Sequence, residues 1–241
     1  MDIVTALAAD GIVCVVGAGG KKTTMYTLAD RLDRAVVTAT VRIPIFDEYV
    51  ARVAVTDDPV ETVRTTEAWP IGVVPERERE DRYLGYDPSV IDELAGLDEP
   101  DAVLVKADGA RMRRLKAPDD REPQLPISAD TVIPIASAHV VGQPLHDDRV
   151  HRVDRVAEIT GLSPGETITA ADVAAVLASD RGGRKDIPED ATVIPLVNMI
   201  DDATLETVGR DIAEAIHART TVPRVVLARM TAEHPLVAVV E

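Results

Sequence analysis

Short apolar runs alternate with segments of helical periodicity along the whole chain. The runs that predict strands are 12–16, 35–38, 51–55, 71–74, 102–107, 131–136, 192–197, 224–227 and 236–240. The segments that predict helices are 23–32, 89–94, 153–159, 169–177 and 204–217. Buried strands that alternate with helices are typical of an α/β fold. We therefore expect a mainly parallel sheet with helices on both faces, in three layers.

Several helix boundaries carry local signals. Asp87 and Pro88 stand where a helix would begin, and Thr169 is a good N-cap for the segment 169–177. Gly161 follows the segment 153–159 and can adopt the left-handed conformation that ends many helices. These signals place the starts and ends of helices independently of the apolar pattern.

Two segments interrupt the alternation of strands and helices. Residues 75–88 begin with a dense run of charges and predict a solvated excursion, with a functional lid as the alternative. Residues 109–128 are basic and then proline-rich, and they follow a predicted strand directly. Ligands of open α/β sheets bind beyond the carboxyl ends of strands, so 109–128 lies where chemistry is expected. We expect one domain over 1–241 that carries both excursions.

Composition and charge narrow the function classes. Apolar residues make up 46% of the 241 residues, which is enough for a packed core. No run reaches the roughly 20 apolar residues of a membrane span, and no signal pattern opens the chain, so a cytoplasmic location is expected. The single cysteine, Cys14, cannot form an internal disulfide. A formal net charge of −16 disfavours binding to nucleic acid, because no net cationic field attracts its phosphates.

The balance of charged residue types is also informative. Arginine outnumbers lysine by 21 to 5 in a chain with a large acidic excess. High salt screens the repulsion among surplus carboxylates, so this composition is typical of a halophilic protein. An ordinary acidic protein from a GC-rich genome is the competing interpretation.

A glycine-rich turn follows the first predicted strand and leads into a helix. It consists of Gly17, Ala18, Gly19, Gly20, Lys21, Lys22, Thr23 and Thr24. A strand that feeds such a turn into a helix N-terminus points several backbone N–H groups at one place, and the helix dipole favours an anion there. Lysine can reach the β- and γ-phosphates of a nucleotide. These eight residues predict a binding loop for a nucleoside triphosphate, ATP or GTP.

The strict phosphate-loop pattern G-x-x-x-x-G-K-[ST] is not met. Val15 stands where the first glycine belongs, and Lys22 stands where the hydroxyl residue belongs. A shift by one residue would pair Lys22 with Thr23, but it would put Lys21 in the second glycine position. We favour Lys21 as the phosphate lysine. A turn without ligand and a dinucleotide loop are the alternatives, the latter disfavoured because position 22 is not glycine.

A carboxylate at the end of a neighbouring strand would complete a magnesium site. The run 102–107 ends at Asp108, and Gly109 permits a turn there. Phosphate-loop enzymes hold Mg²⁺ with a hydroxyl and an aspartate. We predict Thr23 and Asp108 as metal ligands, with Thr24 as the alternative hydroxyl, and Lys21 and Asp108 as catalytic residues. An ordinary Asp-Gly turn is the competing interpretation of Asp108.

The segment after Asp108 gathers cations in an otherwise acidic chain. They are Arg111, Arg113, Arg114, Lys116 and Arg121. Such a cluster beside a phosphate site suits a second anion, or the charge that develops during phosphoryl transfer. We expect Arg111, Lys116 and Arg121 to contact a small anionic substrate. The alternative is a solvated loop that pairs with nearby acids.

Three histidines lie near one another in the chain, His139, His146 and His151. Their spacing fits no standard metal pattern, and the lone cysteine adds little, so a zinc site is disfavoured. We expect His151 to contact the substrate.

A polar segment follows the predicted strand 192–197. Asn198 and Asp201 occupy the positions of Asn and Asp in the Asn-Lys-x-Asp loop with which many GTP-binding proteins read the base, although Met199 replaces the lysine. We predict base recognition by Asn198 and Asp201. An N-cap role at the start of the following helix is an equally favoured alternative.

Several segments together resemble the YqeC-like family. They are Val16–Lys21, Thr38–Thr40, Ala107–Ala110, Leu115–Pro118, Glu122–Pro126, Gly142–Leu145, Val150–Arg152 and Asn198–Asp201. The resemblance implies a P-loop NTPase-like fold and a role as an accessory protein of selenium-dependent molybdenum hydroxylases, in maturing a selenium- or molybdenum-containing cofactor. It also places Thr38 and Thr40 among the substrate contacts.

The chain departs from the family pattern at three positions. Lys22 replaces an expected threonine, Lys106 an acidic residue and Arg121 a histidine. Loss of the acid at position 106 removes a candidate catalytic base. These departures therefore weigh against hydrolysis more than against nucleotide binding.

We expect a magnesium-dependent NTPase or phosphotransferase that acts on a small anionic substrate, without nucleic acid or membrane partners. A nucleotide-gated chaperone or carrier, whose turnover a protein partner stimulates, is the second hypothesis. A phosphate-loop relic that binds no nucleotide is the third.

Overall fold

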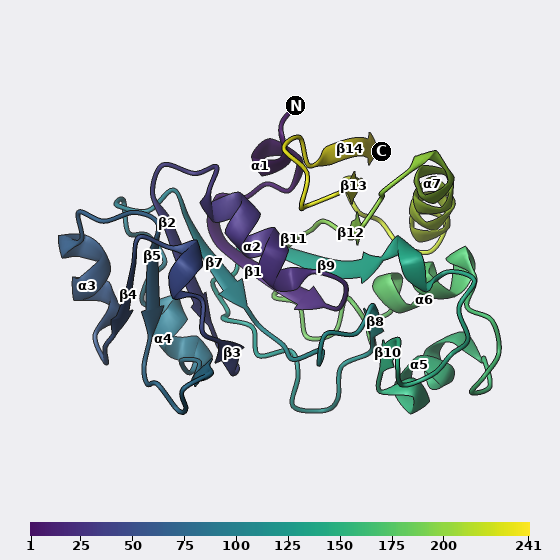
Figure 1. Ribbon diagram of the computed structural model, residues 1–241, viewed down its shortest axis with the longest axis horizontal. Coiled ribbons are helices and arrows are strands. Elements are labelled where there is room, and N and C mark those ends of the chain that lie inside the picture. The colour runs from purple at the N-terminus through teal and green to yellow at the C-terminus, as the bar shows by residue number, and fades with distance from the viewer.

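A computed structural model describes all 241 residues, and a ten-stranded sheet forms the centre of the fold (Figure 1). The strand order is β14 (Leu236–Val240), β13 (Val225–Ala228), β12 (Leu196–Asn198), β9 (Thr131–Ser137), β1 (Gly11–Gly17), β7 (Ala102–Lys106), β2 (Ala35–Ala39), β5 (Ile71–Val74) and β4 (Arg52–Val55). The short β11 (Thr192–Val193) also pairs with β9. All pairs are parallel except β13 with β14, so the predicted mainly parallel sheet is confirmed.

Helices cover both faces of this sheet. They are α1 (Ile3–Ala6), α2 (Lys21–Ala29), α3 (Pro59–Thr65), α4 (Pro88–Asp92), α5 (Val153–Thr160), α6 (Ala170–Ala178) and α7 (Ala203–His217), with 3₁₀ turns η1 (Asp47–Tyr49) and η2 (Ala138–Val140). One apolar cluster joins α1 and α2 to one face of the strands. Two further clusters join α3 and α4, and α5 to α7, to the other face. The three-layer α/β class is confirmed.

The helix caps predicted from local sequence signals are confirmed. Thr169 caps α6 in a capping box with Asp172, and Gly161 ends α5 in the left-handed conformation. Asp87 caps α4, with Pro88 in its first turn. The expected helix 23–32 instead begins at Lys21 and ends at Ala29, because the glycine turn feeds straight into it.

The predicted strand 192–197 is two strands, β11 and β12. Ile194 and Pro195 separate them, because proline has no N–H to donate to a sheet ladder. Two short helices, α1 and α3, went unpredicted: α1 has only four residues, and α3 is rich in β-branched residues, which weaken a helical signal.

Both excursions contribute to the core. The charged run 76–82 is mostly exposed, as expected, but segment 75–88 also holds buried positions that the sequence did not reveal. Within it β6 (Arg82–Tyr83) pairs with β3 (Ile43–Pro44), and Tyr83 and Tyr86 are buried. In 109–128, β8 (Leu115–Lys116) pairs with β10 (Val150–His151) and is buried. The charged side chains at the surface concealed these buried positions in the sequence.

The strand order reverses direction at β1. The chain crosses from β1 to β2 on one side, whereas β9, β12 and β13 follow on the other. Open α/β sheets bind ligands beyond the carboxyl ends of strands at such a switch point. The glycine turn that follows β1 therefore lies at the position where this fold holds ligands. No helix is long and apolar enough to cross a bilayer.

Candidate functional site

The turn Gly17–Gly20 is pressed against the neighbouring strands. Gly17, Gly19 and Gly20 all have positive φ, and a Cβ at Gly17 would lie 2.4 Å from the carbonyl oxygen of Ile135. The N–H of Ala18 donates to that same carbonyl at 2.9 Å. Only glycine can adopt a positive φ and also lie this close to a neighbouring strand. The turn Gly17–Gly20 is therefore lined by backbone atoms, and we call it the glycine cradle.

The first turn of α2 opens into this cradle. Its N-cap is Gly20, which offers no side chain to satisfy the free N–H groups, and the turn contains no acidic residue. The Thr24 hydroxyl donates to the carbonyl of Gly20 at 3.1 Å and is buried. The Thr23 hydroxyl has no such bond and is partly exposed. The helix end is suited to an anion, and Thr23 rather than Thr24 has a free hydroxyl.

The buried carboxylate of Asp108 is hydrogen-bonded to the glycine cradle. Asp108 accepts a hydrogen bond from the Gly17 N–H at 2.9 Å through Oδ2. The Lys21 ammonium lies 2.8 Å from Oδ1 and also donates to the Gly17 carbonyl, and the Lys116 ammonium lies 2.8 Å from Oδ2. The three side chains are 5% exposed or less. The sequence-predicted pair of Lys21 and Asp108 is thus in direct contact.

Burial and neighbouring charge act in opposite directions on this cluster. Burial alone would raise the pKa of Asp108, but the ammonium groups of Lys21 and Lys116 outweigh it and hold that pKa below its ordinary value. Burial lowers the pKa of Lys21, and the charge of Asp108 only partly offsets this. The ion pairs therefore keep Asp108 ionised.

Lys106 adds a third buried ammonium at the end of β7. Its Nζ donates to the carbonyl of Arg42 at 2.8 Å. Burial, followed by the charge of Lys21, lowers the pKa of Lys106 to about 7. Lys106, where the resemblance led us to expect an acid, is therefore partly neutral near physiological pH.

A chain of alternating charges leads from Asp108 to the segment 109–128. Lys116 contacts Glu122 at 2.6 Å, and Arg152 contacts Glu122 at 2.7 Å and Asp119 at 2.6 Å. Glu122 also accepts from the Gly109 N–H at 3.0 Å. Burial would raise the pKa of Glu122, but Lys116 and its hydrogen bonds lower it. The charge network extends from the glycine turn to the start of α5.

Glu122 and Arg152 are central to this network, although sequence reasoning assigned them no role. Both stood in segments that resemble the YqeC-like family, and that was the only signal available. Their pairing spans 30 residues of sequence, so no local pattern could have revealed it.

An open cavity of about 630 Å³ lies at the end of this network. It is lined by Gly109, Arg111, Arg113, Asp119, Glu122, Asp147, Val150, His151, Arg152 and Val153. Burial and the charges of Arg152 and Lys116 lower the pKa of His151 to about 4, so its imidazole is neutral at ordinary pH. Two predicted substrate contacts, Arg111 and His151, meet here, and Lys116 lies buried behind them.

Other predicted substrate contacts are placed elsewhere. The Thr38 hydroxyl is buried and donates to the Val73 carbonyl at 2.8 Å, a bond within the sheet. Thr40 donates to the Gln124 carbonyl at 2.6 Å and ties down the 109–128 segment. Arg121 is exposed and does not line the cavity. The placement of these three residues gives their predicted contacts no support.

Asn198 holds the glycine turn. Its amide donates to the Gly19 carbonyl at 2.9 Å, its carbonyl accepts from the Met230 N–H at 3.2 Å, and it is 3% exposed. Asp201 is exposed and pairs with His139 at 2.6 Å and Arg229 at 3.3 Å. The placement of Asn198 thus supports a structural task rather than base recognition. The N-cap of α7 is Asp202, so neither predicted residue caps that helix.

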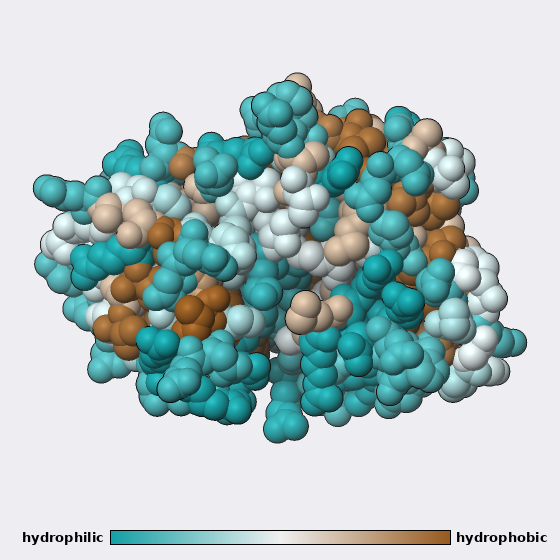
Figure 2. All heavy atoms as spheres, in the orientation of Figure 1, coloured by the Kyte–Doolittle hydropathy of each residue, from teal (hydrophilic) through white to brown (hydrophobic).

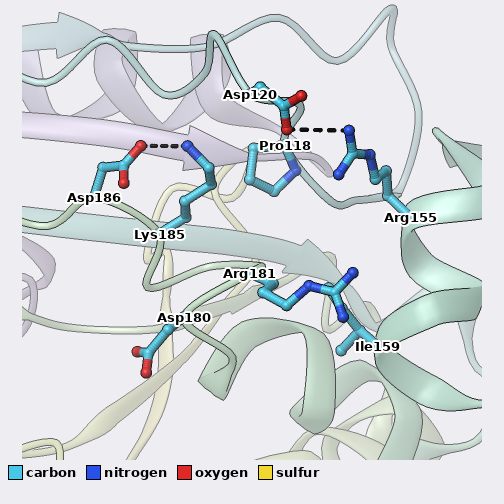
Figure 3. Close-up of a pocket in the computed structure, with 8 residues that line it drawn as sticks. All are labelled: Pro118, Asp120, Arg155, Ile159, Asp180, Arg181, Lys185 and Asp186. Carbon is cyan, nitrogen blue, oxygen red and sulfur yellow. Dashed lines mark hydrogen bonds and ion pairs between the residues drawn. The ribbon is translucent and has the colours of Figure 1, made fainter.

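A second, smaller cavity of about 200 Å³ lies nearby, and its charges are paired (Figure 3). It is lined by Pro118, Asp120, Arg155, Ile159, Asp180, Arg181, Lys185 and Asp186. Arg155 contacts Asp120 at 3.1 Å, and Lys185 contacts Asp186, as the dashed lines in Figure 3 mark. Arg181 pairs with Glu158 outside the cavity. Because its cations already have carboxylate partners, this cavity is a poor candidate for a ligand site.

The fold and site together define an α/β protein with a glycine cradle and a buried lysine–carboxylate cluster at the switch point of its sheet. The family model described as "YqeC protein" matches residues 13–154. The uncharacterized protein YqeC of Escherichia coli (strain K12) is 31% identical over 193 residues, which cover 78% of this chain and 75% of that protein. The chain therefore belongs to the YqeC family. No solved structure matches it.

Proposed function

We propose that this protein binds a nucleoside triphosphate with magnesium and acts as an NTPase or phosphotransferase in the maturation of a selenium- or molybdenum-containing cofactor. The observation that carries the proposal is the contact of Lys21 with Asp108 beneath an all-backbone cradle at a helix N-terminus. Backbone N–H groups, a helix dipole and a lysine converge there, which is the chemistry that phosphate groups require. The maturation role rests on the family resemblance alone.

The residues fit a magnesium ion. Asp108 Oδ1 is buried and accepts no hydrogen bond of good geometry, although Lys21 lies beside it. The partly exposed Thr23 hydroxyl is free of internal hydrogen bonds. These are the oxygen ligands that Mg²⁺ takes in phosphate-loop sites, where the ion neutralises charge on the β- and γ-phosphates. Lys21 would leave Asp108 for the phosphates, and Lys116 would remain to balance Asp108.

A nucleotide-gated carrier with little intrinsic turnover is the second candidate. The observation that favours it is the state of the carboxylates nearest the cradle. Asp108 and Glu122 are both paired with lysine, and both have lowered pKa values, so neither is a good general base. Hydrolysis by the isolated protein would separate the two candidates.

The test is calorimetric titration of ATP and GTP, with magnesium, in high salt, against wild type, Lys21→Ala and Lys22→Ala. Loss of a lysine contact to phosphate costs about 1.5–3 kcal/mol, or roughly tenfold or more in affinity. We expect that loss in Lys21→Ala and a smaller one in Lys22→Ala. The reverse order would move the loop by one residue. No binding of either nucleotide to wild type would refute the proposal.

A further inference from the structure

The cavity of about 630 Å³ differs from its smaller neighbour in its charge balance. Arg152 is paired with Asp119 and Glu122, which accounts for two of the three carboxylates that line the cavity. No carboxylate lies within ion-pair distance of Arg111 or Arg113, and Arg113 reaches only the backbone carbonyl of Arg111. Two cationic side chains of a strongly acidic protein thus line one cavity without partners.

The start of α5 adds backbone donors to the same cavity. Its N-cap, Arg152, has a φ of 63° and makes no side-chain cap, and Val153 lines the cavity. The first N–H groups of a helix have no partner within it. In α5 these are the N–H groups of Val153, Asp154 and Arg155, and they have no acceptor elsewhere in the chain. Asp154 is the one acidic residue of that turn.

The surroundings suit a polar ligand. In Figure 2 the surface over β8, β10 and the start of α5 is mostly hydrophilic, and only Val150 and Val153 among the lining residues are apolar. His151 is partly buried in the wall and, as a neutral imidazole, can donate or accept one hydrogen bond. A largely apolar molecule would find little surface to bury here.

We propose that this cavity binds the oxyanion group of a small organic second substrate, a phosphate or a carboxylate, through Arg111, Arg113 and the first-turn N–H groups of α5. The Lys116–Glu122 pair links this cavity to Asp108, because Glu122 lines the cavity and Lys116 contacts both carboxylates. The role of the ligand as second substrate rests on the proposed nucleotide function, whereas its binding does not.

The test follows backbone amide resonances of the ¹⁵N-labelled full chain during titration with inorganic phosphate and, separately, succinate. We expect saturable shifts at Val153, Asp154 and Arg155 with at least one probe. The combined variant Arg111→Ala/Arg113→Ala should weaken that binding at least tenfold. Arg64→Ala removes an exposed arginine of α3 and should leave it unchanged within twofold.

Each outcome decides the proposal. Tighter binding of phosphate assigns the site to phosphate esters, and tighter binding of succinate assigns it to carboxylates. Shifts confined to residues 17–24, or binding that survives in the double variant, would overturn it. A separate titration with magnesium-ATP reads residues 17–24, so failure of the nucleotide proposal would be visible independently of the cavity.

Discussion

Two loops leave the adjacent strands β1 and β7 at the same edge of the sheet, and they are built by opposite means. The turn Gly17–Gly20 is made of backbone: its Gly17 N–H donates to Asp108, and its Gly19 carbonyl accepts from the Asn198 amide. The segment after Asp108 is held by side-chain ion pairs through Lys116, Glu122 and Arg152. A backbone cradle leaves no room for a side chain, whereas we expect the ion-pair loop to tolerate change at its exposed rim and not at its buried end.

Removal of the charge that both loops share should have the largest effect. Asp108→Asn would leave the buried Lys21 without a counter-charge and Lys116 with Glu122 alone, and breaking a buried pair costs about 3–5 kcal/mol. Chemical denaturation should report a loss of that size. The matched change Asp119→Asn removes a carboxylate that is 31% exposed, and it should cost about 1 kcal/mol or less. Equal losses would contradict the contrast between the buried and exposed ends.

The second largest difference should come from adding one methyl group to each loop and comparing the loss of stability. Gly17→Ala forces a Cβ to 2.4 Å from the Ile135 carbonyl at a φ of +86°, which should cost about 2–4 kcal/mol in strain and overpacking. Gly109→Ala meets only the Glu122 carboxylate oxygen, at 3.3 Å, and should cost less than about 1 kcal/mol. Thermal unfolding of both variants gives the comparison. If Gly17→Ala unfolded at the same temperature as wild type, the cradle would not be tightly packed.

The smallest effect concerns pH and the ion-pair loop. The pKa of His151 is lowered from 6.5 to about 4, so the unfolded chain binds its proton first as pH falls. Stability should therefore fall between pH 6.5 and 4, by about 1–2 kcal/mol after solvent screening of this half-exposed ring. His151→Asn should flatten that part of the stability curve. An unchanged slope in the variant would assign the acid sensitivity to other groups.

Much of the fold could be predicted from local patterns. Each strand of the large sheet coincides with a short apolar run. The inner strands β2, β5, β7 and β9 are buried throughout, because both of their faces are covered, whereas the edge strands β4 and β14 are partly exposed. Pro195 divided one predicted strand, and α1 and α3 were too short or too weakly helical to stand out. Those differences change boundaries and leave the fold class intact.

The sequence by itself determined the α/β fold and the glycine turn, since both depend on neighbours along the chain: the apolar period, the glycines at positive φ and the helix that follows. Only the tertiary structure decided the charge partners. It joined Lys116 and Arg152 to Glu122, and it turned Asn198 onto the cradle. A buried charge is stabilised by whichever opposite charge packs against it, and that choice belongs to the packing of distant segments rather than to any spacing in the sequence.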